Sequence, residues 1–345
     1  MVSLLKLETR NLKRRLMKKS GRLVAMSLLA GASAYVAGSW IAGRALARRL
    51  ISGTGLVPAR EQRADLLDAL RGAGFFFEQL RYPGSRHDPV ELAAVFASPD
   101  SNTSARPTVL FLHGKGGNAA EWRPEAMRAL ACGYNVLLPD LRGHGESGGT
   151  FVTYGFLETE DLHNAISSAS RRFGFDSRRL GVHGCSAGAT LAIELAADRE
   201  GVKALWIESP YADPHDIARH YLSLTTGLPS WLLALTGRFA VGRAVAHVRR
   251  ELDLAKDAGG LESVDPLLSI ARVRAAVCLV YGERDELVPP QFAARLEQAL
   301  PADAEVWRAA DAGHCHHDDE PARVATEEYD RRWRAFFGRH LPIKT

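Results

Sequence analysis

Short apolar runs punctuate the chain from about residue 75 onward. The runs at 75–83 and 91–99 flank Pro83 and Gly84, so they predict two strands joined by a turn. The later runs are continuously apolar, which is typical of strands buried on both faces of a sheet. These strands are expected at 108–114, 134–140, 179–184, 203–209, 276–282 and 304–310.

Helical patterns separate these runs, at 120–132, 157–173, 186–198, 289–300 and 322–339. Strands that alternate with helices favour an α/β fold with a mostly parallel sheet, covered by helices on both faces. Residues 211–273 interrupt the alternation with apolar helices that are broken by Gly227, Pro229 and Gly237. An insertion that follows the carboxyl end of a strand is well placed to be a lid.

The N-terminal part of the chain has a different pattern. Residues 23–43 hold no charge. This uncharged stretch is long enough to form a helix that crosses a bilayer. We predict a transmembrane anchor there, preceded by a basic segment at 1–22 and followed by a connector at 44–73 with one short helix. A cleaved signal sequence is an alternative, because Ala32–Ser33–Ala34 fits a small-x-small cleavage site. A helix buried in the soluble fold is a third, but it leaves the basic segment unexplained.

The flanking charges predict an orientation for this anchor. Residues 1–22 carry eight Lys or Arg and one acid, whereas only Arg44, Arg48 and Arg49 follow closely. The positive-inside rule therefore places the N-terminus in the cytoplasm and the rest of the chain outside it. The expected location is the cytoplasmic membrane, with a secreted or periplasmic protein as the alternative after cleavage.

Composition narrows the choice of function. The 345 residues are 46% hydrophobic and 24% charged, which suits a globular protein with a substantial core. The net charge of +4 comes from the basic residues at the N-terminus, so nucleic-acid binding by the rest of the chain is not favoured. Cys132, Cys185 and Cys278 lie in or beside apolar segments and are expected to be packed free thiols. Together with Cys315 they are too scattered to indicate a redox compartment.

The stretch GVHGCSAGAT contains Gly-x-Ser-x-Gly at Gly184–Gly188, between a predicted strand and a predicted helix. Such a turn strains the backbone at Ser186, and small neighbours let the chains pass closely. It exposes the hydroxyl above the sheet, where the helix N-terminus favours developing negative charge. A tight packing turn whose serine only caps the helix is the alternative.

A serine nucleophile needs a base, and the base needs an acid. His314 lies in a loop after the last predicted strand, and Asp285 follows the strand at 276–282. Both are therefore expected at the same sheet edge as Ser186. The oxyanion of the intermediate needs two donors, for which we expect the backbone N–H groups of Ala187 and Lys115. Lys115 could instead bind a phosphate, but the glycines around it do not have the spacing of the Walker motif.

Six segments together point to a known family: LFLHGKGGNAAEW, LLPDLRGHGESGG, YGFLETEDL, LGVHGCSAG, YGERDELVP and AGH. In this order, over about residues 76–340, they resemble the signature segments of the α/β-hydrolase superfamily. The branch they resemble most is that of serine aminopeptidase-like and prolyl-oligopeptidase-like hydrolases. The resemblance implies an α/β-hydrolase domain at 74–340, a triad of Ser186, Asp285 and His314, an oxyanion hole at Lys115 and Ala187, and no cofactor. Superfamily members with Asp as the nucleophile are disfavoured, because Ser186 stands at that position.

Several nearby residues have competing interpretations. The stretch HCHHDDE at 314–320 could bind a metal, but adjacent residues rarely converge on one ion, so no metal is expected. Glu283 and Glu286 compete with Asp285 as the acid, and the family pattern favours Asp285. His144 is interpreted as structural, within a tight turn behind the oxyanion segment.

We therefore expect a hydrolase that cleaves small-molecule esters, or amides or thioesters, through an acyl-enzyme. The apolar insertion suits an acyl or aromatic substrate. A peptidase of the same fold and a membrane-anchored, non-catalytic binding protein are the alternatives. The sequence does not indicate the natural substrate or the oligomeric state.

Overall fold

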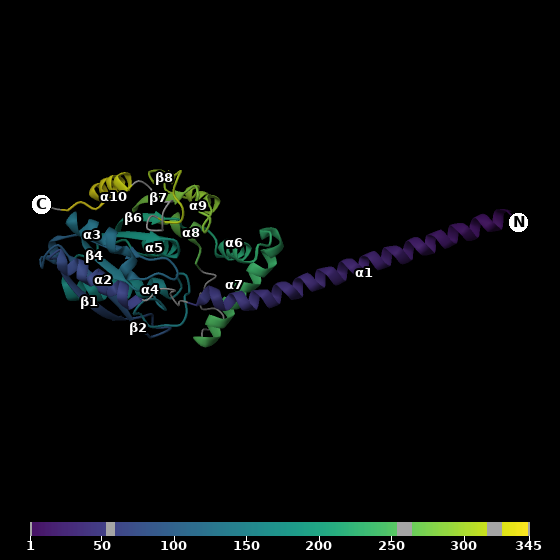
Figure 1. The fold of residues 1–345 in the computed structure, drawn as a ribbon, viewed down its shortest axis with the longest axis horizontal. Coiled ribbons are helices and arrows are strands. Elements are labelled where there is room, and N and C mark those ends of the chain that lie inside the picture. Colours follow the sequence, from purple (N-terminus) through teal and green to yellow (C-terminus); the bar gives the residue numbers. More distant parts are fainter. Residues whose placement is uncertain (1, 53–58, 254–263, 316–325, 344–345) are drawn as a thin grey trace.

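The structure is a computed structural model that describes residues 2–52, 59–253, 264–315 and 326–343. In this part of the chain, eight strands form one sheet in the order β1-β2-β4-β3-β5-β6-β7-β8 (Figure 1). The strands are β1 (Phe76–Pro83), β2 (Glu91–Ser98), β3 (Thr108–Leu112), β4 (Asn135–Pro139), β5 (Leu180–Cys185), β6 (Val202–Glu208), β7 (Ala276–Gly282) and β8 (Glu305–Ala309).

The sheet is mostly parallel, as predicted. Strand β2 pairs antiparallel with β1 and with β4, and every later pair, from β3–β4 to β7–β8, is parallel. The central strands β3, β4 and β5 are buried along their whole length, which explains their continuously apolar sequences. Because β3 to β8 run in one direction, the loops after their carboxyl ends meet at a single edge.

Helices cover both faces of this sheet. One face packs against α2 (Ala59–Gly72), α3 (Arg123–Ala131) and α10 (Thr326–His340), with Trp122, Tyr329 and Trp333 fully buried between them. The other face packs against α4 (Glu158–Phe173), α5 (Ala187–Asp198), α8 (Pro266–Ile270) and α9 (Pro290–Glu297). The two apolar clusters are the core that holds the strand ends, and so the loops after them, in place.

The helical insertion lies between β6 and β7. It consists of α6 (Pro214–Thr226), a 3-10 turn at Ser230–Leu233 and α7 (Ala234–Glu251). Helix α8 falls within the range predicted for the lid, but it packs on the sheet cover beside α5. The lid prediction is therefore too long at its C-terminal end, and residues 254–263 of it lie outside the described residues.

The N-terminal segments form one helix, α1 (Val2–Ile51), most of which projects away from the domain (Figure 1). The predicted connector at 44–73 is wrong at its start, because 44–51 continue this helix. The Ala- and Arg-rich sequence there favours helix, and its apolar positions recur on one side. Leu46, Ala47 and Ile51 pack against α6 and α7.

Within α1, the stretch Val24–Ile51 is long and apolar enough to cross a membrane. It is the one helix of this kind in the described part of the chain, and residues 24–38 of it are exposed, whereas Leu46, Ala47 and Ile51 are buried. This agrees with the predicted apolar N-terminal helix. Its length and composition alone do not distinguish an anchor from a signal sequence.

Gly43 lies where the backbones of α1 and α7 are in close contact, and this contact can be tested. A Cβ at Gly43 would lie 2.8 Å from the Cβ of Phe239. We expect Gly43→Leu to push α7 away and to expose it to trypsin, with cleavage at least about fivefold faster, because overpacking costs about 1–3 kcal/mol. Gly38→Leu is the matched control, since nothing lies within 4 Å of a Cβ there. Equal cleavage of both variants would contradict the contact.

Candidate active site

Ser186 occupies a sharp turn between β5 and α5. Its backbone has φ 54° and ψ −120°, a strained conformation for a residue with a side chain. Its N–H donates to the carbonyl of Glu208 on β6 (2.8 Å), which ties the turn to the neighbouring strand. The side chain is half-buried and stands at the N-terminus of α5. The predicted strand-to-helix turn is therefore present.

Two glycines make this turn possible. A Cβ at Gly184 would overlap the carbonyl of Gly188, and a Cβ at Gly188 would overlap the carbonyl of Leu112 at the end of β3. The start of α5 thus lies directly against β3. The loop after β3 passes beside Ser186, because a Cβ at Gly114 would be 3.4 Å from the Cβ of Ser186.

Asp285 and His314 meet at the same sheet edge. The His314 Nδ1 and the Asp285 Oδ2 are 2.9 Å apart, and the Asp285 side chain is completely buried. The other carboxylate oxygen, Oδ1, accepts from the backbone N–H groups of Leu287 (3.0 Å) and Val288 (2.7 Å). Asp285 is thereby held in one orientation. Glu283 and Glu286, the two competing acids, are both exposed.

A disulfide joins the two halves of this site. Cys185, directly before Ser186, is bonded to Cys315, directly after His314, with the two Cα atoms 6.0 Å apart. The prediction that Cys185 is a packed free thiol is therefore wrong, whereas Cys132 and Cys278 are free. A covalent bond thus fixes the loop that carries His314 beside the turn that carries Ser186.

The same disulfide bears on the metal interpretation. Cys185, His314 and Cys315 have possible ligand atoms within 4.8 Å of one another. However, both sulfurs are used in the disulfide and offer no thiolate, which is the form that binds metals. The rest of the stretch HCHHDDE, from His316 to Glu320, lies outside the described residues.

Two histidines shape the loop that was predicted to hold the oxyanion. His113 accepts from the N–H of Leu141 (3.0 Å), and its other ring nitrogen lies 2.8 Å from the carbonyl of Gly114. His144 accepts from the N–H of Gly116 (3.0 Å), and its other nitrogen lies 2.8 Å from the carbonyl of Arg142. Burial lowers the pKa of His144, which keeps its ring neutral and able to accept.

The structural interpretation of His144 agrees with these hydrogen bonds, whereas His113 was missed. The His113–Gly114 pair directly after β3 was a signal for this role, since a buried polar ring needs a nearby hydrogen-bond partner.

The two residues predicted as oxyanion donors both flank Ser186. Ala187 is the first residue of α5, so its N–H has no acceptor within the helix. Lys115 follows Gly114 in the loop after β3. Its ammonium points elsewhere, donating to the carbonyls of Arg49 and, at 2.9 Å, of Leu50 at the end of α1. No local sequence pattern indicates this contact between the N-terminal helix and the loop.

The fold and these positions can now be compared with known proteins. A model of the Alpha/beta hydrolase family matches residues 109–327, well over half of the chain. The protein belongs to this family. The match runs from β3 through β8, and so includes the turn at Ser186 and the loops that carry Asp285 and His314, whereas β1 and β2 lie before it.

Relatives of this hydrolase include enzymes that act on esters. It is 25% identical over 255 residues to a thermostable monoacylglycerol lipase of Bacillus sp., covering 67% of this chain and 90% of that protein. An esterase of Pyrococcus furiosus superposes with a TM-score of 0.58 and 25% identity, over 79% of this chain and 96% of that one. These neighbours support hydrolase activity.

Other relatives match over a shorter length. The uncharacterised protein YqkD of Bacillus subtilis is 27% identical over 191 residues, 55% of this chain and 58% of that protein. This chain spans about half the length of the first curated relatives that it matches.

The disulfide generates a prediction about stability. It closes a loop of 130 residues, so its removal frees a long stretch of the unfolded chain. We expect the double variant Cys185→Ala, Cys315→Ala to lose about 2–5 kcal/mol of unfolding free energy in guanidinium titrations. A reductant should lower the stability of the wild type and leave that of the double variant unchanged.

Cys132→Ala serves as the control for this experiment, because Cys132 is a free thiol away from the bond. It should keep the wild-type response to reductant. Thiol titration of the unfolded, unreduced protein should detect two free thiols, those of Cys132 and Cys278. Detection of four thiols in protein isolated without reductant would contradict the disulfide.

Proposed function

We propose that this protein is a serine hydrolase that cleaves carboxylic esters, with Ser186 as the nucleophile. The observation that carries the proposal is the pair formed by His314 and the buried Asp285, at 2.9 Å, on the sheet edge where Ser186 stands. A hydroxyl becomes a useful nucleophile when a base takes its proton, and a neutral imidazole held by a carboxylate is such a base.

The reaction proceeds in two halves. The Oγ of Ser186 attacks the ester carbonyl carbon while its proton passes to the Nε2 of His314, and Asp285 stabilises the imidazolium that forms. The oxyanion accepts hydrogen bonds from the backbone N–H groups of Ala187 and Lys115. Collapse breaks the bond to the alcohol, which leaves with the proton of His314. Water, deprotonated by His314, then attacks the acyl-enzyme and releases the acid and Ser186.

We further propose that α1 anchors the enzyme in the cytoplasmic membrane, with the hydrolase domain outside the cytoplasm. Two independent observations support this orientation. The basic charges precede the apolar stretch of α1 in the sequence, as the positive-inside rule requires. In addition, the Cys185–Cys315 disulfide suits an oxidising compartment. The relative named as a monoacylglycerol lipase supports esters as the substrate class.

The nucleophile is tested with a fluorophosphonate probe. We expect the full chain in detergent to be labelled on Ser186, and Ser186→Ala to lose labelling and about 10⁴–10⁶-fold in kcat on p-nitrophenyl butyrate. Ser101→Ala, in an exposed loop, is the control and should behave as the wild type. An unlabelled wild type, or equal labelling of the wild type and Ser186→Ala, would contradict Ser186 as the nucleophile. Turnover of p-nitroanilides but not of esters would reassign the enzyme as an amidase.

The orientation is tested in spheroplasts of a bacterial host that produces the full chain. Protease added to intact spheroplasts should digest the hydrolase domain and leave a cytoplasmic marker protein whole. The N-terminal segment should be protected until the cells are lysed. Digestion of the domain only after lysis would contradict the proposed side of the membrane. A mature N-terminus near residue 35, read by mass spectrometry, would instead indicate a cleaved signal sequence.

A further inference from the structure

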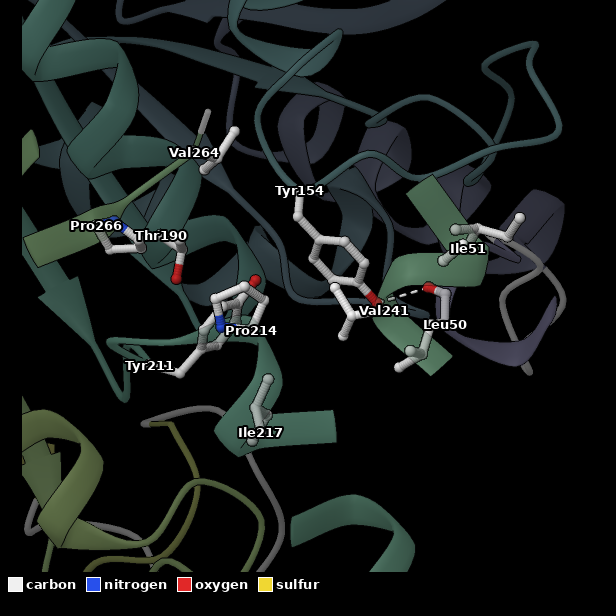
Figure 2. A pocket seen from close by; sticks show the side chains of 11 residues that line it. Leu50, Ile51, Tyr154, Thr190, Tyr211, Pro214, Ile217, Val241, Val264 and Pro266 are labelled. Carbon is white, nitrogen blue, oxygen red and sulfur yellow. Dashed lines mark hydrogen bonds between the residues drawn. The ribbon is translucent and has the colours of Figure 1, made fainter. Parts of the chain in front are cut away.

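An apolar pocket lies where α1, the insertion and the hydrolase domain meet. The space between its walls is about 560 Å³, part of which is open to solvent. Its walls come from distant parts of the chain: Leu50 and Ile51 on α1, Tyr154 on the loop before α4, Ile217 on α6, and Val241 on α7 (Figure 2). The lining is almost entirely aliphatic and aromatic, which suits a hydrocarbon chain rather than a charged ligand.

The pocket begins directly beside the proposed nucleophile. Thr190, which lines it, is one turn further along α5, and its N–H donates to the carbonyl of Ser186 (3.2 Å). Tyr211, which lines the pocket beside Thr190, packs in one buried cluster with Ala187 (Figure 2). A substrate whose carbonyl lies at Ser186 can therefore extend its apolar part into this pocket.

The end of α1 is fastened to the loops of the site. The ammonium of Lys115, the residue of the oxyanion loop, donates to the carbonyls of Arg49 and Leu50. The hydroxyl of Tyr154 donates to the same Leu50 carbonyl at 2.6 Å (Figure 2). The Ile51 carbonyl accepts from the N–H of Val152 at 2.8 Å.

These contacts satisfy carbonyls that a helix C-terminus leaves without partners, and they place a cation where the helix dipole favours one. Lys115 is an exposed residue, but its ammonium lies against the protein, and this desolvation lowers the pKa of the ammonium to about 8. The wall that Leu50 and Ile51 provide is thus held in a fixed position relative to Ser186.

The insertion also carries an exposed apolar tip beside the apolar part of α1. The hydroxyl of Tyr35 on α1 donates to the carbonyl of Leu232 at 2.7 Å, so the two segments lie together. At this tip Trp231 is 73% exposed, and Leu224 and Leu228 are 49% and 44% exposed. An exposed apolar surface continuous with a membrane-spanning helix is at the depth of the lipid, where burial in the bilayer is favourable.

We propose, resting on the proposed serine hydrolase function, that the last turn of α1 is part of the substrate site. Leu50 and Ile51 form one wall of a pocket that binds the acyl chain of a membrane lipid ester. The lipid enters from the bilayer beside the exposed tip around Trp231, and its carbonyl reaches Ser186. The anchor helix is then a specificity determinant as well as an attachment to the membrane.

The pocket wall is tested with the full chain in lipid nanodiscs, using p-nitrophenyl acetate and p-nitrophenyl dodecanoate. Leu50→Trp fills the pocket from α1 and should lower the ratio of kcat/KM for dodecanoate to that for acetate by at least about tenfold, as expected when a hydrophobic pocket loses room. Ile41→Trp, at a 63% exposed position of the same helix, is the matched control and should keep the ratio. Ile217→Trp repeats the test from the opposite wall.

Fluorophosphonate labelling of Ser186 separates the possible results. Labelled Leu50→Trp and Ile217→Trp variants with an unchanged chain-length ratio would overturn the pocket while leaving the serine hydrolase intact. An unlabelled, inactive wild type would instead overturn the proposed function and the pocket with it. If Leu50→Trp alone fails to label because it does not fold, the labelled Ile217→Trp variant decides.

The entry route is tested with monooleoylglycerol embedded in the nanodisc and p-nitrophenyl acetate in solution. Trp231→Ser should lower the ratio of the hydrolysis rate of monooleoylglycerol to that of p-nitrophenyl acetate several-fold, because the tip then binds the bilayer less well. Leu268→Ser, at a 67% exposed position on α8 outside the insertion tip, is the control and should keep the ratio. Equal ratios in both variants would show that the substrate arrives from solution and would overturn the membrane route.

Discussion

The turn at Ser186 depends on how closely α5 can approach β3, and the rest of the site depends on that turn. Gly184 and Gly188 let the backbones pass where any side chain would overlap a carbonyl. The hydrogen bond from Ser186 to β6 then fixes the strained backbone. The loops after β3, β7 and β8 lie at the same sheet edge as this turn, and the disulfide between Cys185 and Cys315 ties the last of them to it. The fold is therefore a frame that holds a locally unfavourable conformation in place.

The fold and the candidate site residues were largely predictable from local patterns. Buried parallel strands require continuous apolar runs, and the loops after them require Gly and short polar residues, so each element is marked in its own stretch of sequence. Asp285 and His314 could be placed at one edge because parallel strands bring their carboxyl ends together. The choice of Asp285 over Glu283 and Glu286 is supported by burial, since only Asp285 is enclosed.

The features that escaped prediction all join distant parts of the chain. Cys185 and Cys315 are 130 residues apart, and only the finished sheet brings β5 beside the loop after β8. The contact of Lys115 with the end of α1 likewise depends on the folded insertion, because α7 is the surface on which α1 lies. Ala- and Arg-rich sequence indicates a helix, but it does not indicate the partner of that helix.

The packing of α1 against α7 has a practical consequence for anyone who studies this enzyme. Trimming the chain of its long apolar helix is a direct way to obtain the hydrolase domain alone. In this protein such trimming also removes Leu50 and Ile51 from the apolar pocket and leaves the ammonium of Lys115 without its carbonyl partners. A fragment with a changed substrate preference would then reflect the loss of this pocket wall, and the cut belongs before Tyr35, which already contacts the insertion.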